Sequence, residues 1–145
     1  ACGGTWMVKK DLIEGEKWAE ITRLAREAVD TMLGLTLAHV GINCAAAQES
    51  ERTAKAICGL FGFPYRAGGA SNHAGSAVEC TKAPGPGTHG HIAIAANNLD
   101  RAIYHLELRG VEFDRSTLKT DARGRAKAVY VAGEFGGFAI HLVQK

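Results

Sequence analysis

One arrangement of segments occurs twice along the chain, and it constrains the fold more than any other feature of the sequence. In each copy an alternating, strand-like segment precedes an amphipathic helix, and further alternating segments follow, across about 38–81 and about 90–145. Such a repeat is one supersecondary unit present twice. The pattern therefore predicts an α+β domain built from two related halves.

The expected elements follow the same order in both copies. The middle strands of the first copy are hard to see, because the stretch 64–75 is rich in glycine. The elements that the patterns predict are a strand at 37–44, a helix at 50–63, strands at 76–81 and 89–96, a helix at 97–110, and strands at 127–132 and 138–144. We expect turns at the sequences DARGR and GEFGG.

Residues 1–34 have a different pattern. An apolar opening run, expected to be a strand, precedes an amphipathic helix from about Asp11, a plausible N-cap, to Leu33, and Gly34 is a good C-terminal stop. We therefore divide the chain into 1–34 and 35–145. The apolar stripe of this helix, from Trp18 to Met32, should be buried against the second domain or a neighbouring chain.

Four predicted strands each carry one residue suited to metal ligation. Because side chains alternate along a strand, each of these residues shares a face with small residues, while branched apolar residues occupy the other face. The four are His39, Glu79, His91 and His141. On a curved sheet they would converge on one divalent cation, with zinc or nickel favoured and cobalt, manganese or iron also compatible.

Composition excludes several classes of function. A formal net charge of +2 with 22% charged residues does not suit a strongly basic nucleic-acid binder. No apolar run approaches the roughly 20 residues of a membrane span, and no signal peptide pattern opens the chain. The cysteines form no CxxC pair, so we expect reduced thiols, with Cys58 and Cys80 buried, and a cytoplasmic location. His73 and His89 are expected in loops.

The repeat resembles the vicinal oxygen chelate superfamily, the glyoxalase I and bleomycin-resistance fold. The resemblance lies in HVGI, AVEC, GHIAIAANNLDRAIYHLELRGVEF and GFAIHLV, and covers about 37–145. It implies two βαβββ modules that form an incomplete barrel around one divalent metal. Carried over by position, the ligands are His39, Glu79, His91 and His141, although the last of these is normally a glutamate.

The resemblance also implies an activity. Glyoxalase I, a lyase, acts on the hemithioacetal of methylglyoxal and glutathione, and a carboxylate moves a proton between adjacent carbons. The usual base is the carboxylate at the position of His141, and a ligated imidazole has no lone pair left to accept a proton. Glu79 is then the catalytic base.

The N-terminal segment resembles another family. CGGTWMVKKDLIEGEKWAEITRLAREAV is similar to the last strand and helix of 2-keto-3-deoxy-6-phosphogluconate aldolase, a (β/α)8 barrel. The Schiff-base lysine of that family would lie upstream, and we interpret Lys9 and Lys10 as solvated. The fragment is therefore not expected to perform aldol cleavage.

Three functions remain open at this point. The first is a metal-dependent, glyoxalase-like enzyme acting on a small 2-oxo carbonyl compound, such as a glutathione adduct, and normally fused to the aldolase. The second is a non-catalytic accessory domain that binds metal or a 2-oxo acid, or oligomerises that aldolase. The third is an iron(II) dioxygenase using two histidines and Glu79. We expect a homodimer and no contact with nucleic acid or membrane.

Overall fold

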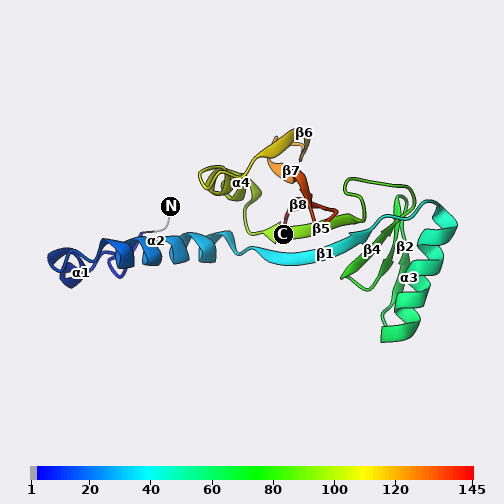
Figure 1. Cartoon of the computed structure of the whole chain (residues 1–145), viewed down its shortest axis with the longest axis horizontal. Coiled ribbons are helices and arrows are strands. Elements are labelled where there is room, and N and C mark those ends of the chain that lie inside the picture. The colour runs from blue at the N-terminus through cyan, green and yellow to red at the C-terminus, as the bar shows by residue number, and fades with distance from the viewer. Residues whose placement is uncertain (1–2) are drawn as a thin grey trace.

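The computed structural model describes residues 3–145. This part of the chain forms four helices and eight strands (Figure 1). The helices are α1 (Lys10–Glu14), α2 (Trp18–Leu33), α3 (Ala47–Phe61) and α4 (Leu99–Glu107). The strands are β1 (Thr36–Ile42), β2 (Tyr65–Ala67), β3 (Ser71–Ala74), β4 (Val78–Thr81), β5 (Gly90–Ala96), β6 (Phe113–Thr120), β7 (Ala126–Phe135) and β8 (Phe138–Gln144).

All strands of the described chain belong to one open, eight-stranded sheet, in the order β2-β3-β4-β1-β5-β8-β7-β6. Each half has the same topology: its first strand is parallel to its last, and the two middle strands continue outward to the sheet edge. The halves meet where β1 pairs antiparallel with β5. The fold is thus α+β with two βαβββ modules, as the sequence repeat predicts, and the sheet does not close into a barrel.

The larger core lies in the second module. Leu99, Ala102 and Ile103 form the buried stripe of α4 and pack with Val129 of β7 and Leu142 of β8. α4 begins as expected, because the Asn98 side chain accepts a hydrogen bond from the Arg101 backbone N–H at 2.9 Å. This packing fixes the outer face of β8 and so directs alternate residues, including His141, to the opposite face.

The first module has a smaller core. Cys44, Ala54 and Cys80 are buried together, beside Ile42 and Val78. Cys44, Cys58 and Cys80 are free thiols, and Cys2 lies outside the described residues. Cys80 is buried as expected, whereas Cys58 is only partly buried.

The N-terminal segment departs from the prediction in three respects. The helix expected from Asp11 to Leu33 is two helices, because Gly15 ends α1 and Glu16 adopts a positive φ of 50°. Asp11 lies in the first turn of α1, where its charge complements the helix dipole, and not at the cap. The opening run, within its described residues, forms turns and bends instead of a strand.

The apolar stripe of α2 is buried only at one end. Leu33 is 1% exposed, and Val29 and Met32 pack against the core of the second module. The other end of α2 and the whole of α1 extend away from the sheet (Figure 1), and Trp18 is 57% exposed. The expected contact with the second domain is therefore made by the last turns of the helix alone.

Two regions of the sheet also differ from the prediction. The Gly-rich stretch of the first module contains β2 and β3. The sequence GEFGG is not a turn throughout, because β7 continues to Phe135 and only Gly136 and Gly137 turn the chain. Their φ values of 60° and 81° suit a tight two-residue hairpin, in which glycine is favoured at both positions.

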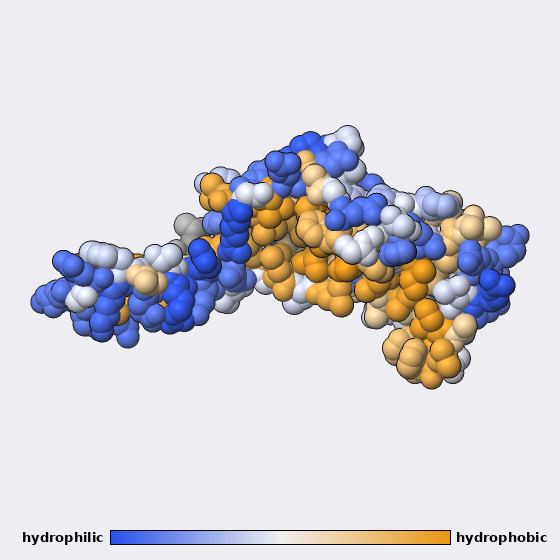
Figure 2. Space-filling view, viewed as in Figure 1, coloured by the Kyte–Doolittle hydropathy of each residue, from blue (hydrophilic) through white to orange (hydrophobic). Residues whose placement is uncertain are grey.

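Figure 2 shows that apolar side chains gather over the middle of one face and at the far end of α3. At that end of α3, Leu60 and Phe61 are more than half exposed, and the rings of Phe61 and Phe63 lie 5.8 Å apart. Among the described residues, no helix is long and apolar enough to cross a membrane.

Candidate metal centre

The four predicted ligands lie on the four central strands of the sheet. His39 lies on β1, Glu79 on β4, His91 on β5 and His141 on β8. Because β1 pairs with β5 and each of these strands also pairs with the last strand of its own module, all four residues meet at the junction of the two modules.

Two small residues make room for them. Gly41 is the register partner of both Glu79 and His91, and Ala93 is the register partner of both His39 and His141. A Cβ atom at Gly41 would lie 2.1 Å from Cε1 of His91, so the imidazole occupies the space that any other side chain at this position would need. The small-residue face that the sequence predicts thus brings the ligand groups close together.

The donor atoms lie at short distances. The Nε2 atom of His39 is 3.1 Å from Nε2 of His91 and 3.1 Å from Oε2 of Glu79. The distance from Nε2 of His91 to Oε2 of Glu79 is 3.4 Å. Ligand nitrogens of the three histidines all lie within 4.8 Å of one another. Ligands about 2.0–2.2 Å from one ion are separated by about 3–3.6 Å, so the donor atoms of His39, His91 and Glu79 have the spacing of ligands to one divalent ion.

One ring nitrogen of His141 is buried and unpaired among the described residues. Its side chain is 9% exposed, and Nε2 has no hydrogen-bond partner among the described residues. Burial, followed by the charges of His91 and His39, lowers its pKa from 6.5 to about 4. The imidazole is therefore neutral at physiological pH and has a free lone pair, as a metal ligand requires. The ring stacks on Tyr130 with centroids 4.7 Å apart.

Glu79 uses its two oxygens differently. Oε2 faces the imidazoles, and the Ser71 hydroxyl donates a 2.5 Å hydrogen bond to Oε1. Hydrogen bonds from His39 and His91, and a smaller effect of Ser71, hold the pKa of this carboxyl well below its usual range, although burial opposes the shift. Glu79 is thus an oriented carboxylate.

Three residues around the site were not predicted from the sequence. Ser71 and His73 lie on β3, where His73 is opposite Glu79 and its Nε2 is 3.4 Å from the Ser71 hydroxyl. The expectation that His73 lies in a loop is therefore wrong. Burial lowers the pKa of His73. Tyr130 is the register partner of His141, and the alternation of residues in 127–132 could have indicated its position.

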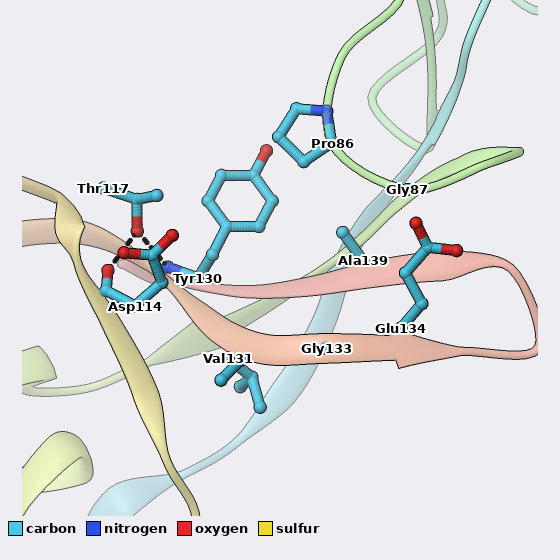
Figure 3. Close-up of a pocket in the computed structure, with 10 residues that line it drawn as sticks. Pro86, Gly87, Asp114, Thr117, Tyr130, Val131, Gly133, Glu134 and Ala139 are labelled. Carbon is cyan, nitrogen blue, oxygen red and sulfur yellow. Dashed lines mark hydrogen bonds between the residues drawn. The ribbon is translucent and has the colours of Figure 1, made fainter.

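A cavity of about 540 Å³ adjoins this cluster (Figure 3). Tyr130 and Ala139 line it, and Ala139 is also the register partner of His91. Pro86 and Gly87 lie over the cavity at one side, and the far end of β7 contributes Glu134. The cluster and the cavity therefore share one face of the sheet.

The arrangement defines a glyoxalase-type, vicinal oxygen chelate fold, and three comparisons bear on it. No family model matches the chain. A hypothetical protein from Bacillus halodurans superposes with a TM-score of 0.55 over 77% of this chain and 94% of its own, at 14% identity. A Streptomyces coelicolor methylmalonyl-CoA epimerase variant with bound 2-nitronate-propionyl-CoA superposes with a TM-score of 0.53 over 76% of this chain and 94% of its own, at 14% identity. The methylmalonyl-CoA epimerase of Mycobacterium tuberculosis superposes with a TM-score of 0.50 over 78% of this chain and 89% of its own, at 17% identity.

The chain also matches an aldolase over a short length. It is 57% identical over 30 residues to the 2-dehydro-3-deoxy-phosphogluconate aldolase of Haemophilus influenzae. These residues are 21% of this chain and only 14% of the aldolase. The length of the match is comparable to that of the N-terminal segment whose sequence resembles such an aldolase.

Proposed function

We propose that the protein is a metal-dependent enzyme that enolises a small 2-oxo carbonyl compound, with the hemithioacetal of methylglyoxal as the first candidate substrate. The observation that carries this proposal is the cluster at the junction of the modules, where ligand nitrogens of His39, His91 and His141 lie within 4.8 Å of one another and the buried Nε2 of His141 has no partner among the described residues. A buried polar atom without a partner is costly, and a bound ion would satisfy it.

The four residues would act as ligands of one divalent cation. His39, His91, His141 and Glu79 supply three neutral nitrogens and one carboxylate oxygen, a set suited to zinc or nickel and compatible with cobalt, manganese or iron. With a divalent ion the site carries a net charge of +1. When bound, the ion would supply electrostatic stabilisation of the oxygen that becomes negative as the substrate enolises.

Glu79 would transfer the proton. If His141 binds the metal, its lone pair is occupied, and Glu79 is the remaining carboxylate of the cluster. Ser71 holds Oε1 of Glu79 at 2.5 Å and so orients the carboxylate toward one side. A base positioned in this way contributes about 10²–10⁴-fold to rate.

The similar folds support the reaction class. Epimerising methylmalonyl-CoA requires removal and return of a proton on the carbon next to a carbonyl, which is the same kind of step. Methylmalonyl-CoA is therefore the second substrate to test. Lactoylglutathione lyase activity and the use of glutathione belong to this proposal as its most specific form.

The experiment combines metal analysis with turnover. The purified protein should contain about one divalent ion per chain and convert the hemithioacetal. Glu79→Gln should lose about 10²–10⁴-fold in rate while it retains metal. His141→Glu, which restores the usual carboxylate of the family that the sequence resembles, should raise glyoxalase turnover. Glu51→Gln, an exposed change on α3, is the matched control.

A fully active Glu79→Gln protein would remove Glu79 as the base. Oxygen consumption by the iron-loaded protein, coupled to substrate loss, would instead favour the dioxygenase alternative. Absence of turnover by every variant, with metal still bound, would favour an accessory domain.

The accessory function is the second candidate, and the aldolase match favours it. It also fits the projecting end of α2, where Trp18 is 57% exposed. In this proposal residues 1–34 belong to an aldolase and 35–145 to the metal-binding domain. Deleting residues 1–34 should leave metal affinity largely unchanged, and a truncation that starts just before Val29, which keeps Leu33 in its core, is the control for lost stability. A large loss of affinity would contradict the two-part division.

A homodimer remains part of the proposal, as does a cytoplasmic location. The exposed apolar side chains at the end of α3, Leu60 and Phe61, support self-association. Sedimentation equilibrium of the metal-loaded protein would give the mass of a dimer, and a monomer at micromolar concentration would refute it.

A further inference from the structure

The cavity beside the metal centre differs in charge from the centre itself. Its lining includes two carboxylates, Asp114 and Glu134, and within the described part of the chain no lysine, arginine or histidine lines it. We propose that this cavity selects substrates whose tail, beyond the carbonyl group that is enolised, is uncharged or cationic, and discriminates against anionic tails. This inference rests on the proposed function, because it assumes that the carbonyl end lies at the metal centre.

The cavity is positioned to receive such a tail. Tyr130 stacks on His141, and Ala139 is the register partner of His91, so two lining residues are immediate neighbours of predicted ligands. Cα partners in a sheet lie about 5 Å apart, which is the length of a few bonds. A group about four bonds from the reacting carbon would therefore reach the cavity.

The two carboxylates lie at different places in the cavity wall (Figure 3). Asp114 accepts hydrogen bonds from the backbone N–H and the hydroxyl of Ser116, and Glu134 accepts one from the Thr88 hydroxyl at 2.9 Å. Neither has an ion-pair partner among the described residues. No ion pair therefore offsets these two exposed carboxylates, and each has spare acceptor capacity for a ligand that carries hydroxyl or ammonium groups.

Tyr130 adds a hydrogen-bond donor. Burial, and to a smaller degree the charge of Glu79, raise the pKa of its phenol, so the hydroxyl stays protonated at neutral pH. Its ring lies between Thr117 and Pro86 in the close-up view (Figure 3). The cavity thus offers one donor and two anionic acceptors around largely apolar walls. Of the substrates that the proposed function admits, it therefore favours those with a short, uncharged or cationic tail over the anionic adducts of glutathione and coenzyme A.

The charge changes sign along the site. A divalent ion with three neutral imidazoles and Glu79 would give +1 at one end, whereas the cavity carries two negative charges at the other. Lys119 acts on His141 from β6 but does not line the cavity. A substrate that becomes anionic at its carbonyl end and is neutral or cationic at its tail matches both ends.

A matched series of thiols tests the proposal. Hemithioacetals of methylglyoxal with 2-(dimethylamino)ethanethiol, 2-mercaptoethanol and 3-mercaptopropionate have tails of similar length and charges of +1, 0 and −1, and the tertiary amine cannot close a thiazolidine ring. Two screened carboxylates should each change affinity about two-fold per unit of ligand charge, so kcat/KM should be about 10-fold higher for the dimethylamino adduct than for the mercaptopropionate adduct. High salt should compress this ratio.

Paired variants identify the source of the preference. Asp114→Asn with Glu134→Gln should reduce the ratio to about two-fold or less, while both side chains keep an acceptor oxygen for Ser116 and Thr88. Glu112→Gln is the control, because it removes one negative charge close to Asp114 in sequence but outside the cavity lining. An unchanged ratio in the double variant, or an equal change in the control, would refute the assignment.

A binding measurement separates this proposal from the proposed reaction. The hydroxamates of 3-(trimethylammonio)propionate and butyrate and the monohydroxamate of succinate chelate metals through the same two oxygens and differ in tail charge. Calorimetry on the metal-loaded protein should give Kd values in the order cationic, neutral, anionic, again over about 10-fold. If this order holds without turnover of any adduct, the proposed function fails and the cavity preference stands. If the adducts are turned over but Kd and kcat/KM do not depend on tail charge, or depend on it in the opposite sense, the cavity preference is refuted and the proposed function stands.

Discussion

Replacing His141 with phenylalanine should separate stability from metal binding. Phenylalanine fills nearly the same space and can keep the stack on Tyr130, whose ring lies 4.7 Å away. The change removes the buried nitrogen that has no partner among the described residues. Leaving such an atom unpaired costs about 1–3 kcal/mol, so the metal-free variant should be at least as stable as the metal-free wild type at pH 8.

The pH dependence of the free energy of unfolding provides a second quantitative test. The pKa of His141 is about 4 in the folded protein, against 6.5 for an unperturbed histidine. Between these values the unfolded chain binds more protons, so the free energy of unfolding of the metal-free wild type falls as the pH falls from about 6.5 to about 4. The full contribution is about 3 kcal/mol, since one pKa unit corresponds to about 1.4 kcal/mol. The His141→Phe variant should lack this contribution to the fall in unfolding free energy.

Urea unfolding in the presence of a chelator, at several pH values, measures both effects. The metal should then be added back at about 100 times the Kd of the wild type, where it stabilises the wild type by about 2.7 kcal/mol and the variant by much less. His105→Phe, a change on α4 away from the cluster, is the control. A metal-free His141→Phe protein that loses more than about 1 kcal/mol at pH 8, or that keeps the wild-type pH slope, would refute this account of the buried nitrogen.

Three further changes test neighbouring parts of the structure. Ser71→Ala removes the hydroxyl that holds Glu79 and should weaken metal affinity about 10–100-fold in a chelator competition, with unchanged secondary structure by circular dichroism. Gly41→Ala places a methyl group where the imidazole of His91 lies, so it should cost about 1–3 kcal/mol of unfolding free energy and abolish stoichiometric metal binding by elemental analysis. Leu99→Ala, at a side chain that is fully buried, should lower the free energy of unfolding by about 2–5 kcal/mol in urea titrations and leave the Kd for metal unchanged, whereas a change of less than 1 kcal/mol would show that the α4 core is not packed as described.

The candidate ligands could be predicted because strand alternation is a local property. His141 lies between Ile140 and Leu142, and His91 is followed by the alternation of Ile92 and Ile94 with alanines, so the period of two already places both histidines on the small-residue face. The repeat likewise assigns each of them to an equivalent position in its module. No long-range information is needed for either inference, and the structure brings the predicted residues together.

The positions of Ser71 and His73 could not be predicted in this way. β3 is only four residues long and lies in a Gly-rich stretch, which is too short to show the alternation of apolar and polar residues that is typical of a strand. Its pairing with β4 places Ser71 against Glu79, and that pairing depends on contacts between strands. The cavity has the same origin, because its walls come from β6, β7, β8 and the loop before β5.

The N-terminal helix shows the limit of periodicity most clearly. The stripe from Trp18 to Met32 has a helical period, and α2 is helical throughout that range. The sequence cannot determine how much of the stripe is buried, because burial depends on where the rest of the chain lies. Only the last turns, from Val29 to Leu33, reach the core of the second module, where Leu33 packs beside α4.

By itself, the sequence determined the two-module α+β organisation and which side chain each central strand presents, since both follow from local alternation and from repetition along the chain. The tertiary structure decided that β1 and β5 pair antiparallel, with Gly41 and Ala93 as register partners of the four donors. Register is set by the fit of whole strands and of the cores behind them, a sum of many long-range contacts that no single segment encodes. That pairing turns four separate polar residues into one cluster, in which donor atoms of His39, His91 and Glu79 lie 3.1–3.4 Å apart and a nitrogen of His141 lies within 4.8 Å of those of the other two histidines.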